Sequence, residues 1–136
     1  PHAGAEAIDA GPLELNGTRH SLFELLAGPQ HTLLLFAGAD PSSRRQVDMA
    51  FLASEVERVY GALIRVLIVA VPGADAAKVG DARTIVRDLE GNLRDRYRAE
   101  EGHVYLIRPD GYVGWRSDRP SLAAFRDYLA RVFVCP

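Results

Sequence analysis

The sequence predicts an α/β fold with a mixed sheet of four to five strands and helices on both faces. Two continuous apolar runs, residues 32–37 and 64–71, are typical of strands buried on both faces. The amphipathic segment between them fits a helix, so the two strands are expected to be parallel. Two further strands and a closing helix follow. After an N-terminal arm, the order β-α-β-α-β-β-α is that of the thioredoxin fold.

The N-terminal part divides into an arm and a short strand–helix unit. Residues 1–12 are rich in Ala and Gly and show no period, which predicts an extended arm or linker before a domain at 13–136. Residues 13–15 fit a short strand closed by an Asn-Gly turn. Ser21 and Glu24 have the spacing of a capping box, which predicts a short helix that ends at a Gly-Pro pair.

The long central helix is predicted from residue 43 to 60. Leu52, Val56 and Val59 recur at helical spacing on one face, with most charged residues elsewhere. Gly61 can end this helix, because glycine adopts the backbone conformations that helix ends need.

The second half predicts a small helix, a hairpin and a final helix. Residues 84–86 fit either a short strand or a helical turn, and residues 92–98 fit a short helix. Strands at 104–107 and 112–115 are joined by a Pro-Asp-Gly turn. A proline at the first helical turn then opens the last helix. Its apolar stripe consists of Leu122, Phe125, Leu129, Val132 and Phe133.

Composition narrows the classes of function. The 136 residues fit one domain, and a net charge of −2 gives no reason to expect nucleic acid or an anionic membrane as a partner. No apolar run reaches the length of a membrane span. The single cysteine, Cys135, cannot form an internal disulfide or a cysteine zinc site. This favours a reducing compartment, and we expect a cytoplasmic protein.

The segment between the first buried strand and the central helix lacks the thiols of a redox protein. Thioredoxin-like enzymes carry a Cys-x-x-Cys pair here, where the helix N-terminus lowers the thiol pKa. In this chain residues 39–46 read ADPSSRRQ, with no cysteine. Ser42 or Ser43 could act as a nucleophile only with a base, and the sequence identifies none. Capping of the helix by these serines is the favoured interpretation.

Other polar residues have structural explanations that outweigh functional ones. Asp110 is a preferred turn former, Trp115 is expected to pack, and Arg116 to pair with a carboxylate. His103 precedes a strand at the place where thioredoxins carry a cis-proline, and it could carry a proton or bind a ligand. The remaining histidines, His2, His20 and His31, show no metal-ligand spacing.

Residues 106–117 read LIRPDGYVGWRS, residues 21–28 read SLFELLAG, and residues 32–38 read TLLLFAG. Together these stretches resemble the C-terminal region of the FAD-dependent aromatic-ring hydroxylases of the phenol hydroxylase and polyketide hydroxylase type, and LIRPDGYVGWRS is similar to the closing hairpin of that region. The helix motif of that family region resembles SLFELLAG. The family's Asp-x-x-Gly-x-Leu-x-x-x-Tyr stretch resembles residues 87–97, and the family's opening Pro-His element resembles Pro1-His2. The resemblance at residues 87–97 favours a strand, a turn and a short helix there.

The resemblance implies a thioredoxin-like domain without redox cysteines at the C-terminus of a flavoprotein monooxygenase. The parent polypeptide would use FAD, NAD(P)H and oxygen to hydroxylate an aromatic substrate, with its FAD-binding and substrate domains upstream. For this chain it implies structural or subunit contacts, including a homodimer, and no catalytic, cofactor-binding or metal residue. Gly80-Asp81-Ala82 matches the family's FAD motif in letters only.

Two alternatives remain open at the level of sequence. The first is a free-standing, redox-inactive thioredoxin-like binding protein. The second is an enzyme that uses Asp110, His103 or the pair Ser42 and Ser43.

Overall fold

A computed structural model describes residues 1–38, 43–70 and 85–132 of the chain. These residues form one mixed sheet of seven strands in the order β2-β1-β5-β4-β3-β6-β7. The elements, in chain order, are β1 (Leu13–Leu15), β2 (Thr18–His20), α1 (Leu22–Leu26), β3 (His31–Phe36), α2 (Arg44–Tyr60), β4 (Ile64–Ala70), β5 (Ile85–Asp88), α3 (Asn92–Tyr97), β6 (Val104–Ile107), β7 (Val113–Ser117) and α4 (Leu122–Val132).

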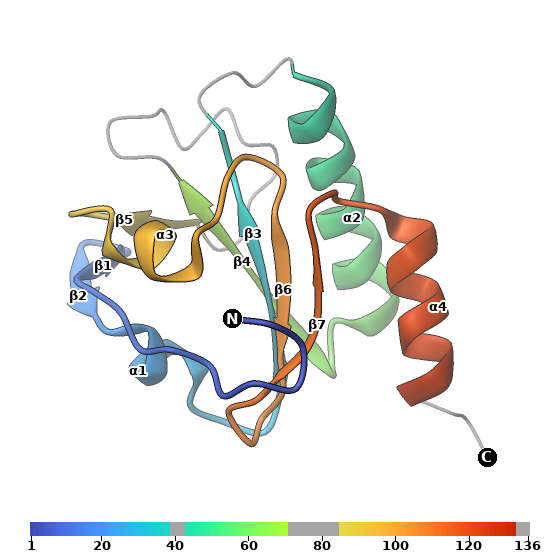
Figure 1. Cartoon of the computed structure of the whole chain (residues 1–136), viewed down its shortest axis with the longest axis horizontal. Helices are drawn as coiled ribbons and strands as arrows, with labels where there is room; N and C mark the ends of the chain where they lie inside the picture. Colours follow the sequence, from blue (N-terminus) through green and yellow to red (C-terminus); the bar gives the residue numbers. More distant parts are fainter. Residues whose placement is uncertain (39–42, 71–84, 133–136) are drawn as a thin grey trace.

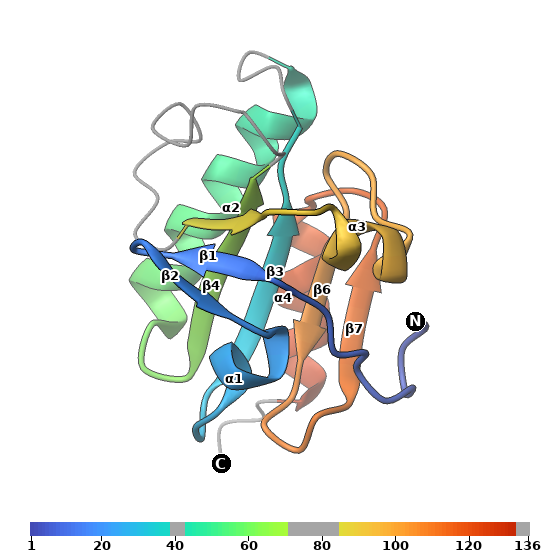
Figure 2. The ribbon, with the colours of Figure 1, turned by 90° about the vertical axis from the view of Figure 1, so that its left-hand side faces the viewer.

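The sheet separates two layers of helices. In Figures 1 and 2, α2 and α4 cover one face, while α1, α3 and the N-terminal arm cover the other. Side chains of β3 alternate between the two cores: Leu33 and Leu35 pack with α2 and α4, whereas Leu34 and Phe36 pack with the opposite layer. All of these side chains are fully buried, as a continuous apolar run predicts for a central strand.

The predicted fold class is confirmed, and the strand pairings explain its mixed character. β3 pairs with β4 in parallel and β4 with β5 in parallel, whereas β6 and β7 form an antiparallel hairpin beside β3. The sheet formed by the described residues has seven strands instead of the expected four to five, because β2 and β5 pair with the two sides of β1. β5 begins at Ile85, so the strand alternative applies there. β7 begins at Val113 rather than Tyr112, after an irregular step in the pairing with β6.

The N-terminal arm, residues 1–12, runs along the molecule and forms one antiparallel bridge, from Glu6 to Tyr112, just before β7. The Gly4 amide donates to the Val113 carbonyl at 2.7 Å, and the Val113 amide donates to the Ala5 carbonyl at 2.8 Å. Ala7 and Ala10 are buried in the core on the α3 side of the sheet. The arm thereby covers part of the outer edge of the last strand.

Candidate functional site at the carboxyl edge of the sheet

The N-terminus of α2 begins just beyond β3, where a thioredoxin-like enzyme would hold its reactive thiol. Ser43 is the N-cap of this helix, and its hydroxyl accepts a hydrogen bond from the Gln46 amide at 3.2 Å. The buried Gln46 side chain in turn accepts from the Gly38 amide at 2.8 Å. The capping role predicted for Ser43 is therefore confirmed, whereas Ser42 lies outside the described residues.

A carboxylate from a distant loop reaches the same helix end. The Ser43 hydroxyl donates to the carboxylate of Glu101, which precedes β6. The Arg45 guanidinium binds the Glu101 carbonyl at 3.0 Å, and a Cβ atom on Gly38 would overlap the Glu101 carboxylate. A negative charge is favourable at a helix N-terminus, where the macrodipole is positive. Glu101 thus stabilises this end of α2, and nothing in its sequence neighbourhood signals this.

Replacement of Glu101 by glutamine is expected to lower the free energy of unfolding by about 1 kcal/mol, since the charge at the helix N-terminus is lost. The neighbouring Glu100→Gln is the control, because Glu100 is exposed and its carboxylate has no partner in the described ranges. Urea unfolding monitored by circular dichroism measures both. Equal stabilities of the two variants would contradict the stabilising role of Glu101.

Arg94 connects α3 with the carboxyl ends of two central strands. Its Nη2 donates to the Ala37 carbonyl at 2.8 Å and to the Val69 carbonyl at 3.4 Å. The guanidinium lies 5.5 Å from the centre of the Phe36 ring. Burial lowers the pKa of Arg94, although the carboxylates of Asp88 and Glu101 oppose this change. Arg94 therefore closes the end of the sheet on the side where ligands commonly bind in α/β folds.

The residues of the Asp-x-x-Gly-x-Leu-x-x-x-Tyr stretch each have a structural role. The fully buried Asp88 accepts hydrogen bonds from the Leu93 amide at 3.3 Å and the Arg94 amide at 2.9 Å, which satisfies the first turn of α3. Gly91 has a φ of +75°, a conformation that other residues rarely adopt. Leu93 is fully buried against the sheet. The expected strand, turn and short helix are all present.

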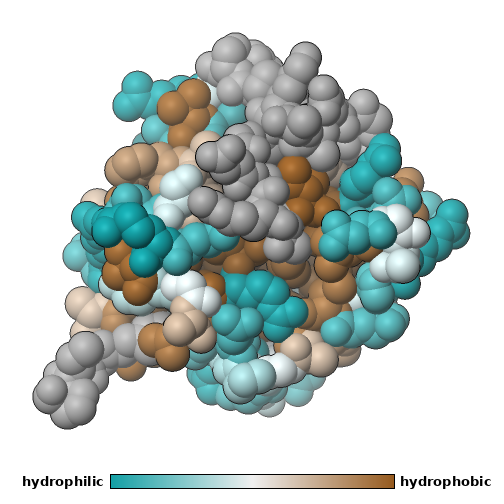
Figure 3. All heavy atoms as spheres, turned by 180° about the vertical axis from the view of Figure 1, so that it is seen from behind, coloured by the Kyte–Doolittle hydropathy of each residue, from teal (hydrophilic) through white to brown (hydrophobic). Residues whose placement is uncertain are grey.

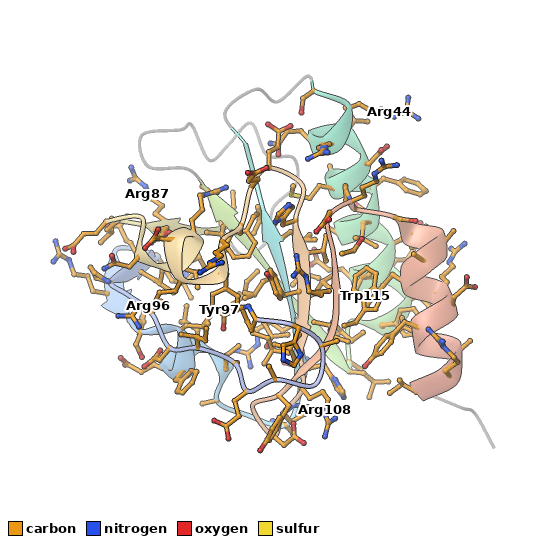
Figure 4. The ribbon with its side chains drawn as sticks, viewed as in Figure 1. Arg44, Arg87, Arg96, Tyr97, Arg108 and Trp115 are labelled. Atoms are coloured by element: carbon orange, nitrogen blue, oxygen red, sulfur yellow. The ribbon has the colours of Figure 1, made fainter. Side chains whose placement is uncertain are left out.

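Tyr97, the last residue of this stretch, holds the N-terminal arm. Its hydroxyl accepts from the Ile8 amide at 2.9 Å and donates to the Ile8 carbonyl at 2.8 Å. Burial raises the pKa of Tyr97 to about 12. The ring packs edge-on against Tyr105, with centroids 5.1 Å apart, and close to Phe36. Figure 4 shows Tyr97 extending from α3 toward the arm.

The β6–β7 hairpin is a structural turn. Asp110 accepts from the Tyr112 amide at 3.3 Å and pairs with Arg108. Desolvation acts to raise the pKa of Asp110, but these hydrogen bonds outweigh it and the pKa is lowered. A carboxyl group with a lowered pKa is ionised near neutral pH and is a poor general acid there.

The aromatic residues of the hairpin face different neighbours. Trp115 packs against Phe125 and Tyr128 of α4, with ring centroids 5.1 and 6.2 Å away, so its expected packing role is confirmed (Figure 4). Tyr112 remains 38% exposed, and its hydroxyl contacts Glu6 of the arm at 3.3 Å. The same two residues form an antiparallel backbone bridge.

His103 and Arg116 take part in local contacts. The Nδ1 atom of His103 accepts from the Glu100 amide at 3.2 Å, and its Nε2 lies 3.9 Å from Asp118. Arg116 pairs with Asp118 at 3.0 Å, as expected, and lies over the Tyr105 ring. Gly80-Asp81-Ala82 and Cys135 lie outside the described residues. Within residues 1–38, 43–70 and 85–132, no three potential metal ligands cluster, and no helix is long and apolar enough to cross a membrane.

Comparison with known proteins links this arrangement to one family. The profile of the family described as aromatic-ring hydroxylase, C-terminal, matches residues 1–136. The 4-methyl-5-nitrocatechol 5-monooxygenase of a Burkholderia species is 43% identical over 42 residues, which make up 31% of this chain and 8% of that protein. The crystal structure of the flavin-dependent monooxygenase PieE, in complex with FAD and substrate, has a TM-score of 0.66 and 27% identity. That match covers 98% of this chain and 20% of PieE.

Two other solved structures match this fold at close to their full length. A conserved protein of unknown function from Bacteroides fragilis has a TM-score of 0.71 and 25% identity, over 96% of this chain and 100% of that chain. The thioredoxin domain of a thiol-disulfide oxidoreductase from Bacteroides vulgatus has a TM-score of 0.69 at 12% identity, over 94% of this chain and 98% of that one. The latter match indicates the fold alone. The two monooxygenases, in contrast, are matched over only 8% and 20% of their lengths.

Proposed function

Because this chain belongs to the aromatic-ring hydroxylase C-terminal family, we propose that it is the C-terminal, thioredoxin-like domain of an FAD-dependent aromatic monooxygenase. The family match over residues 1–136 carries this proposal. The parent polypeptide would hydroxylate an aromatic substrate with NAD(P)H and oxygen. FAD binding and hydroxylation would belong to its upstream domains, and these domains would be the partners of this one.

Within that polypeptide, the proposed role of this domain is structural. The groups at the usual thiol position are engaged with one another: Ser43 caps α2 and Glu101 binds Ser43. Asp110 serves the hairpin turn and His103 serves the loop before β6. A homodimer contact through this domain is a further part of the proposal.

The first test is the intact mass of the native gene product, together with its visible absorption spectrum. We expect a product several times heavier than the 14.9 kDa of this chain, with the absorption bands of a bound flavin. A colourless product of this chain's own mass would refute the proposal. FAD bound stoichiometrically by the 136 residues alone would also contradict it, because flavin binding is assigned to other domains.

A free-standing, redox-inactive binding protein is the second candidate. The match to the Bacteroides fragilis protein over its entire length favours it, because there the same fold makes up a whole crystallised chain. The mass measurement separates the two candidates directly.

A further inference from the structure

A hollow of about 410 Å³ lies beside α3, on the face opposite to α2 and α4. Its lining, here called the α3 face, consists of Gly91, Arg94, Asp95, Arg98, Ala99 and Glu100. Four of these six residues carry charge, so the α3 face is suited to a polar partner rather than to an apolar one.

The outer charges of the α3 face have no partners within the described part of the chain. Elsewhere, neighbouring charges pair, as Arg108 does with Asp110 and Arg116 with Asp118. Among the described residues the Arg98 side chain makes no hydrogen bond or ion pair, as is also the case for other exposed arginines such as Arg96 and Arg119, although the Arg98 backbone is fixed. Its φ is +49°, and its amide donates to the carbonyl of Asp95 at 3.1 Å. Arg98 therefore extends an exposed side chain from a fixed backbone position and has no internal partner within the described residues.

The N-terminus of the domain lies on the same side of the molecule as the α3 face. In Figure 2 the N-terminus and α3 lie toward one edge of the molecule, with α2 and α4 behind the sheet. A C-terminal domain that matches 20% of a flavin-dependent monooxygenase has most of that polypeptide before it. The upstream polypeptide would therefore join the domain on the same side of the molecule as the α3 face.

We propose that the α3 face is the docking surface for the polypeptide preceding Pro1, and that an acidic side chain of that polypeptide pairs with Arg98. The proposal rests on the proposed function. Any surface that covers Arg98 must supply a carboxylate or leave a desolvated cation unpaired, which is unfavourable. The arm, held by Tyr97, fixes the point at which the preceding chain meets this surface.

The opposite face is less suited to this role. Val47 and Phe51 of α2 are 54% and 58% exposed, but they belong to the layer behind the sheet, away from the arm. Figure 3, which shows the molecule from behind the view of Figure 1, has apolar atoms of the described residues at the surface in groups divided by polar ones. A second hollow on the α2–α4 side, of about 360 Å³, includes the exposed Arg119. Arg119 is therefore a matched reference for Arg98.

Arginine labelling of the intact gene product with phenylglyoxal tests the docking surface. We expect Arg98 to react at least ten times more slowly than Arg119, although both side chains are exposed in this domain. The charge reversal Arg98→Glu should raise amide hydrogen exchange several-fold at residues 91–101, whereas Arg119→Glu should leave that exchange unchanged.

The outcomes separate this inference from the proposed function. A heavy flavoprotein in which Arg98 reacts as fast as Arg119, or in which the two charge reversals behave alike, would refute the docking surface and leave the proposed function intact. A gene product with the mass of this chain alone would refute the proposed function itself, and the docking surface with it.

Discussion

Tyr97→Phe is expected to lower the free energy of unfolding by about 2 kcal/mol, because it removes both hydrogen bonds between the phenol and Ile8. The ring stays in place, so the loss comes from an amide and a carbonyl that no longer have their partner. Urea unfolding measures the loss, and amide exchange at Ile8 reports release of the arm.

Tyr112→Phe is the matched control for this prediction. It also deletes a phenol that contacts the arm, but Tyr112 is 38% exposed and its single contact with Glu6 is replaceable by water. We expect a change below about 0.5 kcal/mol. If both variants lose the same stability, the arm is not held by Tyr97.

Tyr97→Phe should also change how the stability of the domain responds to alkaline pH. Burial raises the pKa of Tyr97 from 10.0 to about 12, so the folded state retains its proton where the unfolded chain loses it. The stabilisation is complete below pH 10 and falls as the pH rises from 10 to 12. Tyr97→Phe should therefore show a shallower loss of stability over that interval. The loss will not vanish, because burial also raises the pKa of Tyr105 and Tyr128.

Asp88→Ala is expected to cost about 2–3 kcal/mol, because the buried carboxylate satisfies two amides of the first turn of α3. Its loss should also loosen Arg94, whose charge Asp88 partly balances. Thermal and urea unfolding measure the effect on stability, and amide exchange at Leu93 and Arg94 locates it.

Asp95→Ala provides the comparison for Asp88. Asp95 belongs to the same short helix, but its side chain is exposed and makes no hydrogen bond within the described part of the chain. A change within about 0.5 kcal/mol is expected. Equal losses for Asp88→Ala and Asp95→Ala would show that helix charge, rather than the buried cap, determines the stability of α3.

Much of the architecture could be predicted because local patterns decided it. The apolar runs at β3 and β4 have no polar face, so burial on both sides is the only stable arrangement. Capping at Ser21 and Ser43 followed from residue type and spacing. The Pro-Asp-Gly turn likewise produced the hairpin, although the first residue of β7 was misplaced by one.

Long-range contacts account for what the sequence did not reveal. Strand β2 has three half-exposed or exposed residues and exists because β1 pairs with it. Glu101 and Ser43 are 58 residues apart, and Tyr97 and Ile8 are 89 apart, so no spacing rule connects them. The resemblance at residues 87–97 indicated that Asp88, Gly91, Leu93 and Tyr97 mattered, but their individual roles required the folded chain.

The arm also bears on the solubility of the domain. The outer edge of β7 is a row of backbone donors and acceptors that another molecule's strand could join. Residues 4–6 lie along the start of that edge at Tyr112 and Val113. A fragment starting at residue 13 would lack this cover and would also expose the apolar core side chains that pack against Ala7 and Ala10. For the preparation of this domain, residues 1–12 therefore act as a guard against strand-to-strand aggregation.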